Sequence, residues 1–266
     1  MNSTVAFVDA FKAFRQKRGL LKIVFLNYIA NFLVVALINI DGTNIIHMVL
    51  NPRVSTWTNQ LLAYRFIVPF AIVVLIIEPF VLSATLNSLP FAIKDHFVIA
   101  DYFRNGLRYF SKSLLFKSIN YMLFIGAAMI SLAIMALLFR ALNWVGLVMA
   151  IAFMLPGWIY LSEFLMSLMV KYVAESGTKG NLAALTKESL IFVNRNYFSM
   201  VTLLVIVSCI QMSALILGIA IGDIPVIGMF LPALLSVGIG VLSLLTILFA
   251  ISIEPSGWKV SIQGSV

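Results

Sequence analysis

Charged residues are scarce in this sequence. Only 11% of its 266 residues are charged and 62% are hydrophobic, whereas soluble domains carry about 25% charged and about 45–50% apolar residues. The apolar residues fall in runs of about twenty, the length that an α-helix needs to cross a hydrocarbon core of about 30 Å. These proportions exclude a soluble globular domain and predict an all-α membrane protein.

Cysteine and histidine are nearly absent, with one Cys and two His. Cys209 has no partner for an intramolecular disulfide, and its position in an apolar run predicts a small core residue. His47 and His96 have no second His or Cys at ligand spacing, so we expect no metal site. Neither a GxxxxGKS or GxxxxGKT phosphate loop nor a GxSxG motif is present. We therefore expect no cofactor and no catalytic residue, and predict that the protein is not an enzyme.

Acidic residues are also few, with 10 Asp and Glu against 18 Lys and Arg, which leaves a net charge of +8. In a soluble protein such an excess would suggest nucleic-acid binding. Here the cations flank apolar runs, where anionic lipid headgroups are the nearer partner. We expect membrane lipids as partners and no nucleic acid.

Long polar stretches are missing too, so the whole chain, 1–266, is predicted to be a single polytopic membrane domain. The first apolar run has no small-residue cleavage site and is expected to be a retained span rather than a signal peptide. The second span ends near Asn87, and its start falls between Ser55 and Phe66. The other five predicted spans are Gly19 to Ile40, Leu114 to Leu138, Asn143 to Val170, Phe198 to Ile221, and Ile227 to Ile253.

The connections between these six spans alternate between many and few cations. With the N-terminus inside, fifteen of the 18 Lys and Arg lie in the cytoplasm, and Arg53, Arg65 and Arg140 lie outside. Because cationic flanks resist translocation, this bias predicts that both termini are cytoplasmic.

Three basic segments on the predicted cytoplasmic side have helical periodicity. In Val98 to Lys117, Phe103 and Leu107 share a stripe opposite Arg104 and Arg108. The N-terminal stretch and Asn181 to Asn196 repeat this pattern less regularly, so we expect three amphipathic interfacial helices. The residues expected to contact lipid headgroups or a partner are Lys12, Arg15, Arg104, Arg108, Lys112, Lys187 and Arg195.

A threefold internal repeat is a further hypothesis, with units 1–97, 98–180 and 181–266. Three segments align without gaps: Ala10 to Gln16, Gly106 to Lys112, and Ser189 to Arg195. Each unit would contain an amphipathic helix and two spans, so the units would be parallel repeats. The alternative is three ordinary interfacial helices whose short apolar segments match by chance.

Each unit would also carry one glutamate near the end of its second span: Glu78, Glu163 and Glu254. Ionisable groups inside a membrane are costly and suggest function. The first interpretation is an interfacial carboxylate that reaches water or a nearby Lys. The alternative is a shared ring of carboxylates that faces a cation or a cationic substrate. Four amides complete the candidate polar site and are expected to form interhelical hydrogen bonds: Asn27, Asn31, Asn120 and Gln211.

Three short stretches carry a family resemblance: Val173 to Gly177, Ala184 to Ser189, and Asn194 to Phe198. With them, the chain resembles bacterial six-span membrane proteins related to the membrane domain attached to glycerophosphodiester phosphodiesterases. The resemblance implies this fold and a bacterial cytoplasmic (inner) membrane. The catalytic barrel of those enzymes and its metal-binding carboxylates have no counterpart here, so their activity is not implied.

Two functional hypotheses remain. In the first, the protein is a non-catalytic membrane protein that organises lipids or a partner protein through its basic amphipathic helices. In the second, it is a transporter, or the permease subunit of an export system whose ATPase is a separate chain. A polar cavity lined by Glu78, Glu163, Asn27 or Asn120 would favour transport, whereas a dry bundle with lipid-facing grooves would favour the first hypothesis.

Overall fold

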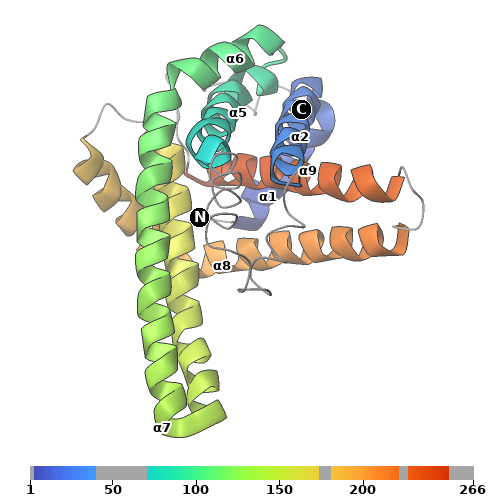
Figure 1. The fold of residues 1–266 in the computed structure, drawn as a ribbon. Coiled ribbons are helices and arrows are strands. Elements are labelled where there is room, and N and C mark those ends of the chain that lie inside the picture. The colour runs from blue at the N-terminus through green and yellow to red at the C-terminus, as the bar shows by residue number, and fades with distance from the viewer. Residues whose placement is uncertain (1–2, 40–70, 174–180, 222–226, 252–266) are drawn as a thin grey trace, which may run out of the picture.

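The computed structural model describes residues 3–39, 71–173, 181–221 and 227–251, and every regular element in these ranges is helical (Figure 1). The predicted all-α class is therefore confirmed for the described part of the chain. The elements are α1 (Ser3–Gln16), α2 (Arg18–Asn39), the π-helical segment η1 (Val73–Ile77), α5 (Glu78–Ile93), α6 (Ile99–Arg108), α7 (Phe110–Val173), α8 (Leu182–Ile221) and α9 (Ile227–Ile251).

The predicted second span ends later than Asn87, because α5 continues to Ile93. Asn87 does not mark a boundary because its side-chain amide is satisfied inside the bundle, where Nδ2 donates to the carbonyl oxygens of Ser83 (3.0 Å) and Val173 (3.2 Å). The predicted start of this span lies outside the described residues.

Helix η1 precedes α5 because of a proline. Pro79 has no N–H to donate to the carbonyl four residues earlier, and the Glu78 N–H bonds five residues back to Val73 O. This wider turn belongs to a π-helix, a form that is often found at functional sites.

Helix α7 is a hairpin rather than one rod. A straight helix of its 64 residues would be about 96 Å long. The chain turns at Asn143 (φ 53°, ψ −136°), where a Cβ on Gly146 would lie 2.1 Å from Leu138 O. Trp158 Nε1 donates to Ser131 Oγ (3.0 Å) between the first arm, 110–142, and the second arm, 144–173. The predicted third and fourth spans fall in these two arms.

Helices α1, α2, α5, α8 and α9 and the core end of α7 enclose the hydrophobic core, whose fully buried members include Leu20, Leu89, Val170 and Leu245. Two glycines allow neighbouring helices to come into close contact. A Cβ on Gly19 of α2 would lie 2.8 Å from Ala92 Cα of α5, and one on Gly106 of α6 would lie 2.4 Å from the Phe80 ring. Such small-residue contacts are typical of helices packed in membranes.

Much of the outer hairpin remains apolar and exposed, including Met122, Leu137, Trp144 and Phe153, each more than 65% accessible. Exposed apolar surface on this scale is expected where lipid replaces water. Four described helical stretches are long and apolar enough to cross a membrane: Val73–Ile93, Phe110–Val173, Leu182–Ser213 and Ala233–Ala250. The chain is thus a candidate multi-pass membrane protein.

The long helices do not form one parallel bundle. In Figure 1 the two arms of α7 run across the direction of α8 and α9. The buried residues of the first arm, Ser113 and Phe116, lie near its start, and most of those of the second lie between Glu163 and Val173. The direction of the outer hairpin therefore depends on contacts at one end only. The described residues show four candidate spans, and six remains a prediction.

Two of the three predicted amphipathic helices are separate elements, α1 and α6, whereas the third is the uninterrupted start of α8. The predicted helix Val98 to Lys117 breaks at Tyr109, between α6 and α7. The apolar stripe of α6 faces outward, with Phe103 50% and Leu107 72% exposed, and Tyr102 and Asn105 form its buried face.

The aligned repeat segments share one structural feature. Their first residues, Ala10, Gly106 and Ser189, are all buried. A helix break follows the first segment, after Gln16, and another break interrupts the second segment at Tyr109. Helix α8 continues through the third segment. The threefold repeat stays a prediction.

The expectation for Cys209 was wrong, because it is exposed on α8, where an apolar side chain can face lipid.

Candidate functional site: a polar cavity among four helices

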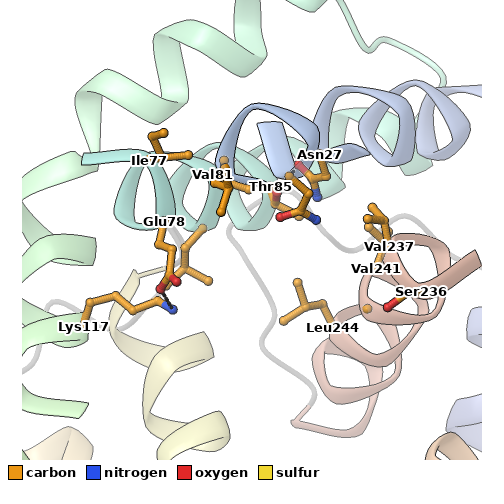
Figure 2. A pocket seen from close by; sticks show the side chains of 14 residues that line it. Asn27, Ile77, Glu78, Val81, Thr85, Lys117, Ser236, Val237, Val241 and Leu244 are labelled. Carbon is orange, nitrogen blue, oxygen red and sulfur yellow. Dashed lines mark hydrogen bonds and ion pairs between the residues drawn. The ribbon is translucent and has the colours of Figure 1, made fainter. Parts of the chain in front are cut away.

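A cavity of about 310 Å³ lies between α2, η1–α5, α7 and α9 (Figure 2). We call it the central cavity. Its volume is in the range of small-molecule sites. Its polar lining residues are Asn27, Asn31, Glu78, Thr85, Lys117 and Ser236. Three of these, Asn27, Asn31 and Glu78, belong to the polar site predicted from the sequence.

An ion pair lies at one end of the central cavity. Lys117 Nζ is 2.8 Å from Glu78 Oε2, and the Tyr121 hydroxyl donates to the same oxygen at 2.5 Å. Glu78 is positioned by the π turn at the start of α5, while Lys117 and Tyr121 lie one turn apart on the first arm of α7. Figure 2 shows the Glu78 and Lys117 side chains pointing toward each other. A paired carboxylate costs far less to bury than a lone one.

A hydrogen-bonded amide lies farther along the same wall. Asn27 is 7% exposed, and its Oδ1 accepts from the hydroxyls of Thr85 (2.9 Å) and Tyr102 (2.5 Å). Within the described ranges, no acceptor is bound to Asn27 Nδ2. This donor is therefore available to a molecule in the central cavity.

Helix α9 supplies the opposite wall, which Figure 2 shows facing Thr85 and Asn27. Val237, Val241 and Leu244 make it largely apolar, and Ser236 adds one hydroxyl with no hydrogen-bond partner in the described part of the chain. Gly240 keeps the space open, because a Cβ built there meets no atom within 4 Å. The central cavity thus combines polar groups on one side with an apolar surface on the other.

Tyr102, which supports this site from α6, gives a pH prediction. Burial raises the pKa of its phenol from 10.0 to about 12, and the Thr85 hydroxyl partly opposes this rise. The folded state therefore holds the phenol proton more tightly than the unfolded state does. The contribution of Tyr102 to the free energy of unfolding is complete below pH 10 and is lost between pH 10 and 12. We expect the free energy of unfolding to fall by about 2 kcal/mol more over this window in wild type than in Y102F. Detergent-solubilised protein unfolded at a series of pH values tests this, and equal losses would contradict it.

Glu163 is placed differently from Glu78. It is 5% exposed, with no hydrogen bond or ion pair among the described residues. It lies where the second arm of α7 crosses α8, between the Tyr160–Asn194 hydrogen bond (2.7 Å) and the Lys171–Glu188 pair (3.7 Å). Among the described residues, the expectation of a carboxylate that reaches a nearby Lys therefore fits Glu78 and does not fit Glu163. Glu163 does not line the central cavity.

The other predicted site residues lie apart from this cavity. Asn120 Oδ1 is buried without a partner in the described chain, and Gln211 is exposed on α8. Glu254 lies outside the described residues, so the structure does not describe a ring of three carboxylates. The predicted headgroup-contact residues Lys12, Arg15, Arg104, Arg108, Lys112, Lys187 and Arg195 are all exposed.

Sequence reasoning missed Thr85, Tyr102, Tyr121 and Ser236 and treated Lys117 only as a cytoplasmic flank. One usable signal was present, because Lys117 and Tyr121 are four residues apart and share a helix face. In the described ranges, no three His, Cys, Asp or Glu side chains are grouped so that they could hold a metal ion.

Comparisons with known proteins add no relative. No protein-family model matches the chain, and no curated protein or solved structure matches it. The class of protein therefore rests on the fold and its surface, which define a candidate integral membrane protein built from helices.

Proposed function

We propose that this protein is a non-catalytic, multi-pass protein of the bacterial cytoplasmic membrane that binds a small, partly polar organic solute in the central cavity. It would act as a transporter or as the permease subunit of an export system. The single observation that carries the proposal is the cavity itself, with the Glu78–Lys117 pair and the open Asn27 amide, in a chain with so few charges.

The arrangement of polar groups supports binding rather than simple packing. A polar group in hydrocarbon is stable only when it is paired, or when it faces water or a ligand. Glu78 is paired, whereas Asn27 Nδ2 and the Ser236 hydroxyl have no acceptor among the described residues. A solute with a hydrogen-bond acceptor and a short apolar part matches these donors and the α9 wall.

The six-span topology, with both termini in the cytoplasm, is part of the proposal. The cation bias along the sequence supports this orientation. Each arm of α7 is long enough for one crossing, but the arms lie across α8 and α9, so six spans would require the outer hairpin to turn about its one contacted end. The family resemblance supports the bacterial cytoplasmic membrane. Because no nucleotide-binding motif is present in the sequence, an ATPase would be a separate chain. Co-purification of an ATPase in mild detergent would favour a permease subunit over an autonomous transporter.

A second candidate function is the organisation of lipids or a partner protein, and helix α6 favours it. Ile99, Phe103 and Leu107 are at least 50% exposed, and Arg104 beside them is exposed as well. A helix with an exposed apolar stripe and exposed cations binds to the surface of an anionic membrane. This role is compatible with a solute site elsewhere in the chain.

Two neighbouring residues of α9 provide the decisive test. Ser236 lines the central cavity, whereas Leu235 lines an apolar groove on another side of the helix. In a C209S background, S236C is expected to react with a charged, water-soluble methanethiosulfonate reagent at least about tenfold faster than L235C, because the reagent needs a thiolate in contact with water.

Both cysteines lie at nearly the same depth, so depth cannot explain a difference between them. G240L should protect S236C by filling the central cavity, since its Cβ enters open space. G157L is the control, because Gly157 also has open space but lies on α7. Equal reaction rates for S236C and L235C would refute a hydrated solute cavity.

A further inference from the structure

A second cavity lies on the other side of α9, between α1, α2, α8 and α9. Its volume is about 650 Å³, and all of its lining residues are apolar or glycine. We call it the α1–α9 groove. Phe7, Phe11 and Phe14 of α1 form one side, and Leu21 and Phe25 of α2 form part of another. Phe11, Leu21 and Phe25 are each more than 50% exposed, which is costly in water but not against an acyl chain.

A polar hollow of about 340 Å³ lies at the corner between α1 and α2. It is lined by Gln16, Arg18, Gly19, Lys22, Asp95 and Phe97. Its one carboxylate, Asp95, is already paired with Lys17 at 2.9 Å. Arg18 and Lys22 are exposed and have no ion-pair partner among the described residues. The hollow therefore has an uncompensated positive charge.

Helix α2 joins the two cavities. Arg18, Leu21, Lys22 and Phe25 follow the i, i+3, i+4, i+7 spacing, so they share one face of the helix. Leu21 and Phe25 line the apolar groove, while Arg18 and Lys22 line the polar hollow. Arg15, in the last turn of α1, is exposed as well. A cationic end thus adjoins a long apolar trough.

We infer that this composite site binds one anionic phospholipid, with its phosphate at Arg18 and Lys22 and an acyl chain in the α1–α9 groove. Charge complementarity identifies the occupant, because a purely apolar partner would leave the cations unused and a soluble anion would leave the groove empty. The surrounding membrane supplies such lipids at high local concentration. The inference concerns a site separate from the central cavity and does not depend on solute transport.

Glycines on α9 allow the two cavities to be blocked separately. Gly238 lines the α1–α9 groove and Gly240 lines the central cavity. A Cβ built at either position meets no atom within 4 Å. G238L should therefore fill the groove without displacing the helices, and G240L is its matched control.

Native mass spectrometry of delipidated protein in detergent, titrated with palmitoyl-oleoyl phosphatidylglycerol or phosphatidylcholine, tests the inference. We expect the first phosphatidylglycerol to bind about tenfold more tightly than phosphatidylcholine, since each basic residue near the headgroup adds attraction. R18Q/K22Q should remove this preference while retaining phosphatidylcholine binding. G238L should weaken binding of both lipids, whereas G240L should leave both unchanged.

An exposed cation on the far end of the first α7 arm provides the charge control. R18Q alone should weaken the preference for phosphatidylglycerol, whereas R140Q, which removes the same charge elsewhere, should retain it. An equal loss in R140Q and R18Q would overturn the inference, because binding would then depend on the total charge of the protein and not on this site. Equal binding by G238L and G240L would overturn it as well. A dimer that G238L dissociates would instead identify a second copy as the occupant of the groove.

Discussion

Replacing Gly19 with alanine is expected to lower the free energy of unfolding by about 1–3 kcal/mol, the usual cost of overpacking. The added Cβ would lie 2.8 Å from Ala92 Cα and 2.9 Å from Ala92 O. Both are backbone atoms of α5, so no side-chain rotation can relieve the contact. The helices would have to separate along the line where Leu20, Ile23 and Leu89 are fully buried. Unfolding by SDS titration in detergent micelles measures the loss.

Gly157 provides the matched control because a Cβ there meets nothing within 4 Å. In a helix interior, alanine is favoured over glycine by about 1 kcal/mol. G157A should therefore be neutral or stabilising, opposite in sign to G19A. Equal effects of G19A and G157A would show that α2 and α5 are not in backbone contact at Gly19.

Replacing Lys117 with glutamine is expected to destabilise the protein by about 1–2 kcal/mol, because it leaves the partly exposed Glu78 carboxylate without its cation. The two groups are 2.8 Å apart and only 22% and 36% exposed. The Tyr121 hydroxyl bonds the same carboxylate oxygen but carries no positive charge to balance it. The loss is measured by the same unfolding titration.

The double-mutant cycle separates this pairing from general effects of the substitution. E78Q/K117Q removes both charges and should recover much of the stability lost in K117Q, with a coupling energy of about 1 kcal/mol. K112Q is the control, because Lys112 lies on the same arm and is exposed. A coupling near zero would mean that the ion pair does not form in the membrane.

The central cavity shows how far residue type alone can identify a site. Asn27, Asn31 and Glu78 were predicted because amides and carboxylates in apolar helices are costly and need a reason to be present. Their shared location could not be predicted, because α2 and α5 are separated by residues 40–77 and can pair in several ways. Lys117 and Tyr121 were missed because residues near the end of a span also occur as ordinary membrane flanks.

Glu78 and Glu163 look equivalent in the sequence, each in an apolar segment late in its proposed unit. One is paired with Lys117 at a cavity, and the other is 5% exposed at a helix crossing without a partner in the described chain. The difference comes from neighbouring helices, since an ion pair depends on which side chain lies opposite. A repeat pattern cannot supply that information.

The sequence by itself determined the helical class, the apolar surface and most of the helix positions, because hydrophobic periodicity and length act within about twenty consecutive residues. It also located the turn between the third and fourth predicted spans, where Asn143 reverses the chain. Only the tertiary structure decided that α7 lies across α8 and α9 and that one face of α9 borders a polar cavity while another borders an apolar groove. These features depend on contacts between distant segments, for which apolar side chains are nearly interchangeable.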